Sequence, residues 1–236
     1  MNFHVGVSGF SYQGWKGKFY PDDAKSEDFL VHYSRKLGSV EINSSFYAPP
    51  GAAVVEKWAE KTGEEFRFSF KAPKMITHVL KLGKRASEAA DQFSKRLSAL
   101  GPRLGPILFQ LPPYAKLDHD LLSDFLSSTS GVKAKVFEFR HESWFQEETF
   151  QLLDGHGAGF CIAETEDLKP VFRVTGGYAY FRLRKDLYDA KLIDMWAKKI
   201  RETGKGIGEC YAYLRHDETG ENAVLAGTLA ENLRGQ

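Results

Sequence analysis

The sequence predicts an α/β fold: a single TIM-like (β/α)8 barrel with a degenerate unit after the sixth strand. Strand-like and helix-like segments alternate along the chain, which favours parallel strands joined by helices. Several strands also end in polar residues of one parity, which suits the mouth of a closed barrel. The 236 residues are close to the roughly 250 typical of such a barrel, and no linker or repeat divides them. We therefore expect one domain over residues 1–236.

Eight strand-like runs, rich in aromatic and β-branched residues, recur along the chain. Helical patterns separate most of them, and the clearest places Phe93, Leu97 and Leu100 at helical spacing. The expected strands are 4–8, 40–43, 66–71, 106–111, 134–140, 159–164, 178–183 and 208–214, and the expected helices are 26–37, 52–61, 84–100, 119–128, 147–153, 190–203 and 221–233.

The segment 165–177 interrupts this alternation. It contains Pro170, Gly176 and Gly177, which are typical of turns, and it has no clear amphipathic helical pattern. The unit after the sixth strand is therefore expected to be degenerate.

The fifth strand shows most clearly why a barrel is expected. Side chains alternate across a strand, so Val136, Glu138 and Arg140 share one face, and Phe137 and Phe139 share the other. Phenylalanines that pack under helices leave the first face to line a barrel interior, apolar low down and charged at the C-terminal mouth. A surface strand with a Glu–Arg pair on its wet face is the alternative reading.

The same alternation places polar residues on one face of other strands. In an open sheet covered on both faces, such polarity would be buried at a cost of several kcal/mol, whereas a barrel mouth avoids that cost. The polar residues at these strand ends include Ser8, Glu41, Asn43, Lys71, Gln110, Glu138, Arg140, Tyr180, Arg182 and Arg184.

Composition limits the classes of function. The net charge of +1 excludes a molecule that is basic overall, so any polyanion site must be a local patch. Nine Lys or Arg between Arg67 and Arg103, against Glu88 and Asp91, form one candidate patch, although a solvated helix face explains much of it. No signal peptide or membrane span is expected, so we predict a cytoplasmic protein.

The two cysteines also fit a reducing compartment. Cys161 and Cys210 each lie within an apolar run, which favours buried, reduced thiols over a disulfide or a zinc cluster.

Eight short motifs occur in order along nearly the whole chain, and their combination is highly specific. Together they resemble the domain-of-unknown-function 72 family, also called YecE-like. The resemblance implies a TIM-barrel-like fold but no defined reaction. The motifs are SGFSY at 8–12, WKG at 15–17, FYP at 19–21, VEINSSFY at 40–47, FKA at 70–72, ITH at 76–78, FQLPP at 109–113 and EFRHESW at 138–144.

The sequence departs from the family pattern mainly on strands seven and eight. The family tends to have His-Gly where Arg184 and Lys185 follow Tyr180 and Arg182, and Asn-Asn-Asp where Arg215 and His216 precede Asp217. Glu164 also replaces a usual Asp, and Ser45 a usual Thr. This side of the mouth is therefore expected to be more basic than in the family.

Four residues are candidates for catalysis. Glu41 and Glu138 are paired carboxylates suited to acid–base work, unless they only neutralise neighbours: Glu138 with Lys71 or Arg182, Glu41 with Arg140. Lys71 could hold a phosphate or carboxylate, or form a Schiff base if its pKa is depressed. His141 could act as an acid–base group or metal ligand, like His78, or serve a structural role.

The remaining candidates are expected to bind substrate. Arg140 and Arg182 are interpreted as anion clamps, because guanidinium groups match phosphate and carboxylate. Aromatic residues just after strand ends should ring the mouth and stack on bases or sugars, or else plug the barrel top. The substrate-binding candidates are Ser8, Tyr12, Trp15, Asn43, Tyr47, His78, Gln110, Arg140, Trp144, Tyr180, Arg182 and Asp217.

No nucleotide-cofactor fingerprint is present, so no cofactor is identified. Three of the seven histidines lie near predicted strand ends: His78, His141 and His216. The many Arg and Lys residues there would repel a cation, so a single divalent metal is possible but not favoured. We expect an enzyme acting on a phosphorylated small molecule or a nucleic acid, by phosphoester or glycosidic-bond chemistry. A non-catalytic nucleic-acid-binding protein and a glycosidase-like or isomerase enzyme for sugars are the alternatives. The sequence gives no oligomeric state.

Overall fold

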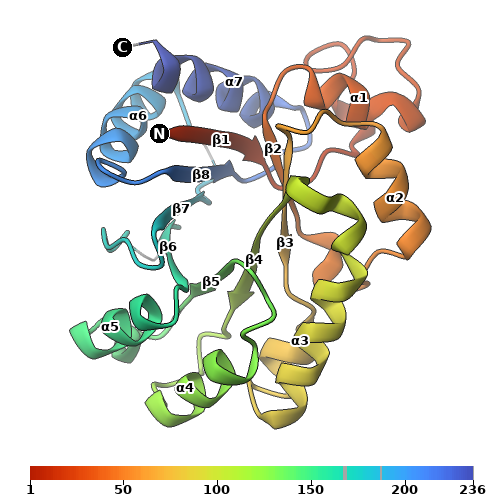
Figure 1. The fold of residues 1–236 in the computed structure, drawn as a ribbon. Coiled ribbons are helices and arrows are strands. Elements are labelled where there is room, and N and C mark those ends of the chain that lie inside the picture. Colours follow the sequence, from red (N-terminus) through yellow and green to blue (C-terminus); the bar gives the residue numbers. More distant parts are fainter. Residues whose placement is uncertain (167–168, 187, 236) are drawn as a thin grey trace.

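The computed structural model describes residues 1–166, 169–186 and 188–235. Eight parallel strands form a nearly closed barrel, and helices surround it (Figure 1). The strands are β1 (Asn2–Val7), β2 (Ser39–Ile42), β3 (Arg67–Lys71), β4 (Leu104–Gln110), β5 (Lys135–Glu138), β6 (Gly159–Glu164), β7 (Tyr178–Leu183) and β8 (Glu209–Leu214). The helices are α1 (Phe29–Ser34), α2 (Ala52–Glu60), α3 (Lys84–Arg96), α4 (His119–Ser128), α5 (Glu147–Gly155), α6 (Ala190–Thr203) and α7 (Glu221–Arg234).

Short helical segments lie in the connections, several of them at the C-terminal ends of strands. They are η1 (Gln13–Trp15), η2 (Ser26–Asp28), η3 (Ser44–Phe46), η4 (Met75–Val79), η5 (Ser98–Arg103) and η6 (Glu142–Trp144). Among the described residues, no helix is long and apolar enough to cross a membrane.

Local sequence signals explain the helix boundaries that the sequence predicted. Helices α4 and α6 span the expected residues because Asp118 and Asp189 cap them, each accepting a hydrogen bond from a backbone N–H of the first turn. The helix expected over 84–100 instead ends at Arg96 and continues as η5, in which Gly101 has a positive φ of 55°. The expected helix over 26–37 is likewise divided into η2 and α1.

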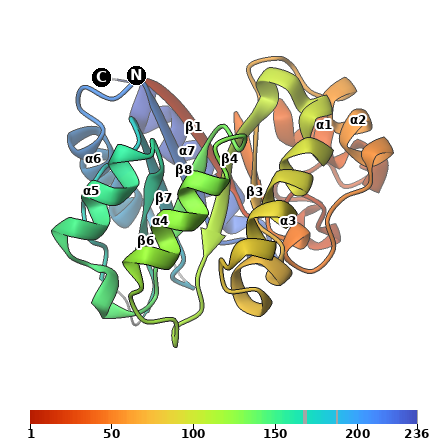
Figure 2. The same cartoon turned by 60° about the horizontal axis from the view of Figure 1, so that its bottom comes forward.

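The degenerate unit is confirmed. Between β6 and β7 the described residues form no helix, and the connection runs between α5 and α6 (Figures 1 and 2). Thr175 anchors it through a hydrogen bond from its hydroxyl to the Ala158 carbonyl, at 2.7 Å. Gly176 has a positive φ of 70°, and a Cβ there would lie 2.6 Å from the Ala158 backbone, so this turn requires glycine.

The two faces of β5 are divided as the sequence predicted. Phe137 packs with Phe109 and Phe125 in the core under the helices. Val136 belongs to a separate cluster inside the barrel. This cluster is mainly apolar, as expected, and the rings of Tyr180, Tyr211 and Tyr213 make up a large part of it. The Tyr213 hydroxyl forms hydrogen bonds with the Ser39 and Ser69 hydroxyls at 2.5 and 2.8 Å, so the polar groups are satisfied locally.

The barrel closes between β1 and β2, where the sheet order begins and ends. Strand β1 pairs along its length with β8, whereas a single bridge, between Ser8 and Glu41, joins it to β2 among the described residues. The buried Tyr33 hydroxyl completes this seam by accepting from the Val7 N–H at 2.9 Å and donating to the Ser39 carbonyl at 2.8 Å. A Cβ on Gly6 would lie 1.9 Å from that carbonyl oxygen, so the close approach requires glycine.

Candidate functional site

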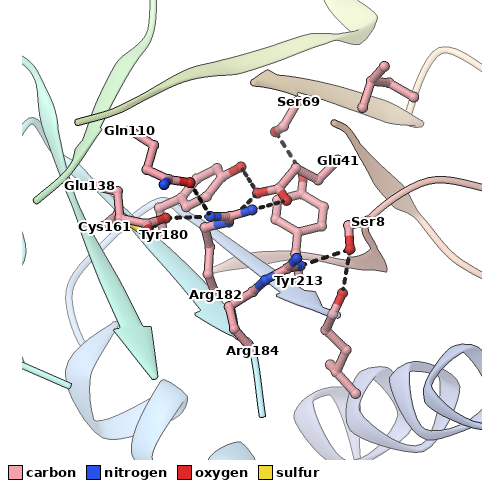
Figure 3. A network of polar contacts seen from close by, with 12 residues as sticks. Ser8, Glu41, Ser69, Gln110, Glu138, Cys161, Tyr180, Arg182, Arg184 and Tyr213 are labelled. Atoms are coloured by element: carbon pink, nitrogen blue, oxygen red, sulfur yellow. Dashed lines mark hydrogen bonds and ion pairs between the residues drawn. The ribbon is translucent and has the colours of Figure 1, made fainter. Parts of the chain in front are cut away.

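Arg182 organises the C-terminal mouth of the barrel. Its Nε and Nη2 donate to the two carboxylate oxygens of Glu41 at 2.8 Å each, and its Nη1 donates to Glu138 Oε2 at 2.5 Å (Figure 3). The Glu41 and Glu138 side chains are 0% exposed, and the Arg182 side chain is 2% exposed. One buried guanidinium therefore holds both candidate catalytic carboxylates together.

The structure selects among the ion pairs that the sequence left open. Glu138 pairs with Arg182, as one reading had it, and also with Arg140. The expected pair of Glu41 with Arg140 is wrong, because Arg182 reaches across from β7 and occupies both oxygens of Glu41. Arg140 lies beyond the end of β5 and its side chain is 21% exposed, so it faces the opening.

Three further side chains complete the network around Arg182. Tyr180, one interior position below it on β7, donates its hydroxyl to Glu41 Oε1 at 2.9 Å. Gln110 Oε1 accepts from Arg182 Nη1 at 3.5 Å, and the buried Cys161 thiol lies 3.8 Å from Glu138 Oε2 (Figure 3). The polar parity seen in the sequence thus brings residues from five strands into contact.

Both carboxylates are ionised at neutral pH. Burial alone would raise the pKa of Glu138, but Arg182 and then Arg140 outweigh it and lower the pKa to about 2. The pKa of Glu41 is also lowered, because Arg182 outweighs the effect of burial. Neither group therefore carries a proton that it could donate at pH 7.

Two cations at the mouth have no carboxylate partner. Among the described residues, neither Lys71 nor Arg184 forms an ion pair. Arg184 Nη1 instead donates to Ser8 Oγ at 2.8 Å, and Lys71 Nζ lies 4.1 Å from the centroid of the Phe46 ring. Burial and the nearby Arg182 lower the pKa of Lys71 to about 8 and that of Arg184 to about 10.

The charges at the mouth therefore do not balance. Its two carboxylates face four cations from β3, β5, β7 and their ends, and the two arginines in ion pairs neutralise both carboxylates. Burial is the main cause of the lowered pKa values of Lys71 and Arg184, and Arg182 adds to it as part of this excess of positive charge. An anion would relieve it.

The histidines and Asn43 lie on the rim. His78 packs edge-on against Phe46 at 5.0 Å between centroids, and burial followed by Lys71 lowers its pKa. His141 Nδ1 accepts from the Ser143 N–H at 3.2 Å and caps η6, so part of its role is to shape the loop. Asn43 directly precedes η3 and is partly exposed.

Two of the four aromatic residues expected to ring the mouth are buried in the main core instead. Trp15 is fully buried and donates its Nε1–H to the Asp217 carbonyl at 2.8 Å, and Trp144 stacks on Phe139 at 4.4 Å. Neither ring is exposed in this structure, so the alternative expectation, in which these aromatic residues pack rather than bind substrate, fits them better. Tyr47 is 83% exposed, and Tyr12 is half-buried against His216.

Asp217 serves the fold rather than the mouth. Its carboxylate accepts hydrogen bonds from the backbone N–H groups of Thr219, Gly220, Glu221 and Asn222, at the start of α7. Because these amides occupy both oxygens, the structure does not support the expected substrate contact.

Arg184 is the main residue that the list of candidates missed. It follows the last residue of β7 and keeps the parity of Tyr180 and Arg182, which was the available signal. Glu164 instead points away from the barrel interior, toward α6. Trp196 Nε1 of that helix and the hydroxyl of Tyr188, just before the helix, donate hydrogen bonds to Glu164 Oε2. Within the described residues, no group of three or more His, Cys, Asp or Glu is arranged to hold a metal ion.

Comparisons with known proteins agree with this architecture. The family model described as "Protein of unknown function DUF72" matches residues 4–236. The UPF0759 protein YecE of Escherichia coli is 36% identical over 234 residues, covering 87% of this chain and 85% of its own. A DUF72 family protein from Thermotoga maritima has a crystal structure that matches with a TM-score of 0.87 and 28% identity, over 99% of each chain.

More distant structures share the fold alone. A D-psicose 3-epimerase from Clostridium cellulolyticum matches with a TM-score of 0.57 at 11% identity, over 99% of this chain and 98% of its own. The family match spans nearly all of the chain, and the curated relative and the T. maritima structure support it. The chain therefore belongs to the DUF72 family.

Proposed function

We propose that the barrel mouth is the active site of an enzyme that acts on a phosphorylated small molecule, nucleotides included. One observation carries the proposal: Lys71 and Arg184 are partly buried cations without a carboxylate partner beside a neutralised cluster. Guanidinium and ammonium groups placed in this way bind phosphate. In TIM-barrel enzymes the active site lies at this end of the barrel.

The ionised carboxylates weigh against the sugar-processing alternative. A glycosidase needs one carboxylic acid that is protonated at working pH. Arg182 and Arg140 keep Glu138 ionised, and Arg182 does the same for Glu41. The likeness to the epimerase concerns the fold alone, so it adds no support for a neutral sugar.

The nucleic-acid-binding alternative loses part of its basis. Arg67 begins β3 and Lys71 ends it, which places them about 13 Å apart at opposite ends of the strand. These two members of the basic run seen in the sequence therefore do not lie on one surface. Tyr47 and Tyr114 remain exposed near the mouth side of β2 and β4, where a nucleotide base could stack on them.

Anion titration tests the proposal. Inorganic phosphate should bind the wild-type protein in a calorimeter, and Arg184→Met should weaken binding by about 1.5–3 kcal/mol, the usual contribution of a charged hydrogen bond. Arg96→Met is the matched control, because Arg96 is exposed at the end of α3, away from the mouth. Equal affinity in all three proteins would rule out this anion site.

Turnover is the second half of the test. A panel of phosphorylated sugars and nucleotides can be followed by phosphorus NMR with wild type and Arg184→Met. Conversion that depends on Arg184 supports an enzyme, whereas phosphate binding without any conversion supports a binding protein.

A further inference from the structure

We infer that Lys71 is a nucleophilic amine that forms an imine with the carbonyl carbon of a phosphorylated aldehyde or ketone bound in the mouth. This inference rests on the proposed anion-binding function and names the substrate class and the group that reacts with it.

The position of Lys71 is the first argument. It is the last residue of β3, it is only partly exposed, and its Nζ lies over the face of the buried Phe46 ring. The nearby carboxylates are occupied, since Arg182 holds Glu41 and Arg182 and Arg140 hold Glu138. The amine is therefore left without a salt bridge at the edge of this cluster of charged side chains.

The surroundings of this amine enlarge its neutral, reactive fraction. Burial and Arg182 lower the pKa of Lys71 to about 8, although Glu138 and Glu41 act in the opposite direction. Roughly half of the amine is then neutral at pH 8, compared with well under 1% of an ordinary lysine. Burial and a second cation are the two means by which proteins activate lysine for Schiff-base chemistry.

Lys135 shows what a buried lysine with a structural role looks like in the same chain. Its Nζ donates to the backbone carbonyls of Thr129 and Val132 at 3.0 and 3.1 Å, near the start of β5. No such hydrogen bond holds Lys71 Nζ among the described residues, so its lone pair is available.

The reaction balances without an added oxidant or reductant. The Nζ lone pair attacks the carbonyl carbon, the π electrons move to oxygen, and a proton passes from nitrogen to that oxygen. The resulting carbinolamine loses water, and a C=N bond replaces the C=O bond. Arg184, which follows β7 and whose Nη1 donates to Ser8 Oγ, would hold the phosphate.

Borohydride trapping tests the imine directly. Glycolaldehyde phosphate and sodium borohydride should convert Lys71 into a stable secondary amine, seen by intact mass and located by peptide mapping. At pH 7.5 the neutral fraction of Lys71 is roughly a quarter, about two hundred times that of an ordinary lysine, so we expect its labelling to exceed that of other lysines by at least about tenfold. Inorganic phosphate should compete, and uncharged glycolaldehyde should label less.

Two variants make the outcome decisive. Lys71→Arg keeps the positive charge but removes the nucleophile, so it should bind phosphate and lose the adduct. Lys74→Met removes an exposed lysine three residues away and should leave labelling unchanged. If phosphate binds in the calorimeter but Lys71 is not labelled above other lysines, the imine is overturned and the anion site stands. If phosphate does not bind at all, the proposed function itself is refuted.

Discussion

Glu138 is the residue whose loss should cost the most at the mouth. It is fully buried and binds two cations, Arg182 and Arg140. Glu138→Ala should lower the free energy of unfolding by about 3–5 kcal/mol, because it leaves buried positive charge unpaired. Urea melts measure this, with the exposed Glu142→Ala as the control, expected within about 0.5 kcal/mol. If Glu138→Ala leaves the free energy of unfolding unchanged, water reaches the ion pairs of Glu138.

The same carboxylate should make the free energy of unfolding depend on pH in the acid range. Its pKa is about 2 in the folded protein and 4.5 ordinarily, so its contribution is complete above pH 4.5 and is lost as the pH falls through 2. Glu138→Gln lacks this titration. The difference in unfolding free energy between wild type and Glu138→Gln should therefore shrink from pH 4.5 toward pH 2. A difference that stays constant across this range would contradict the lowered pKa.

Deprotonation of Lys71 should make the affinity for anions fall at alkaline pH. Its charge is present below a pKa of about 8 and is lost above it. Sulfate is a useful probe because it stays a dianion, and its affinity should fall as the pH rises through 8. Lys71→Met should bind sulfate more weakly, by about 1.5–3 kcal/mol, and without this dependence. A pH dependence that persists in Lys71→Met would assign it to another group.

At the scale of elements, the seam between β1 and β2 depends on Gly6. A Cβ there would lie 1.9 Å from the Ser39 carbonyl oxygen, so Gly6→Ala should force the strands apart. We expect a loss of about 3 kcal/mol or more in a thermal or urea melt. Gly38→Ala is the matched control beside the same strand, since nothing lies within 4 Å of its added Cβ. Similar effects of the two substitutions would show that the seam tolerates widening.

Helix α7 depends in the same way on Asp217. The carboxylate accepts from backbone N–H groups at the start of the helix, and these hydrogen bonds lower its pKa against the opposing effect of burial. Asp217→Ala should cost about 0.5–2 kcal/mol of stability and leave phosphate affinity unchanged. Glu218→Ala, next to it and exposed, should change neither stability nor phosphate affinity. Loss of phosphate affinity in Asp217→Ala alone would restore the sequence-based expectation of a substrate contact.

At the scale of the whole molecule, we predict that the mouth binds anions without a divalent metal. The cations there come from Arg and Lys side chains, which bind phosphate directly. Phosphate should raise the melting temperature equally before and after treatment with a chelator. Stoichiometric zinc, together with loss of the shift after chelation, would contradict the prediction.

The thiols report on the closed barrel as a whole. Cys161 and Cys210 are free and buried, as the sequence predicted, and burial raises the pKa of Cys210 to about 12. Both should react with a water-soluble thiol reagent only after unfolding. Rapid labelling of native protein would show that the barrel opens readily.

Strand parity allowed the sequence to predict much of this fold and which side chains face the mouth. Alternation along β5 and β7 is a local property, so Glu138 and Arg182 were assigned to the interior. Pairing across the barrel depends on strand tilt and side-chain reach, so the partner of Glu41 could not be predicted. The burial of Trp15 and Trp144 depends on loops that fold back over the strands, and sequence spacing does not encode that.

The position of β1 beside β8 in the barrel also determines when β1 can pair during synthesis of the protein. In the part of the chain that the structure describes, strand β1 pairs along its length with β8, from Asn2 with Glu209 to Val7 with Leu214, and α7 packs on β1. At about 5–20 residues per second, a ribosome needs roughly 10–40 s to travel from the first strand to the last. Throughout that interval the nascent β1 is an unpaired edge, so its protection by the ribosome surface or a chaperone would govern how much chain reaches the native state in the cell.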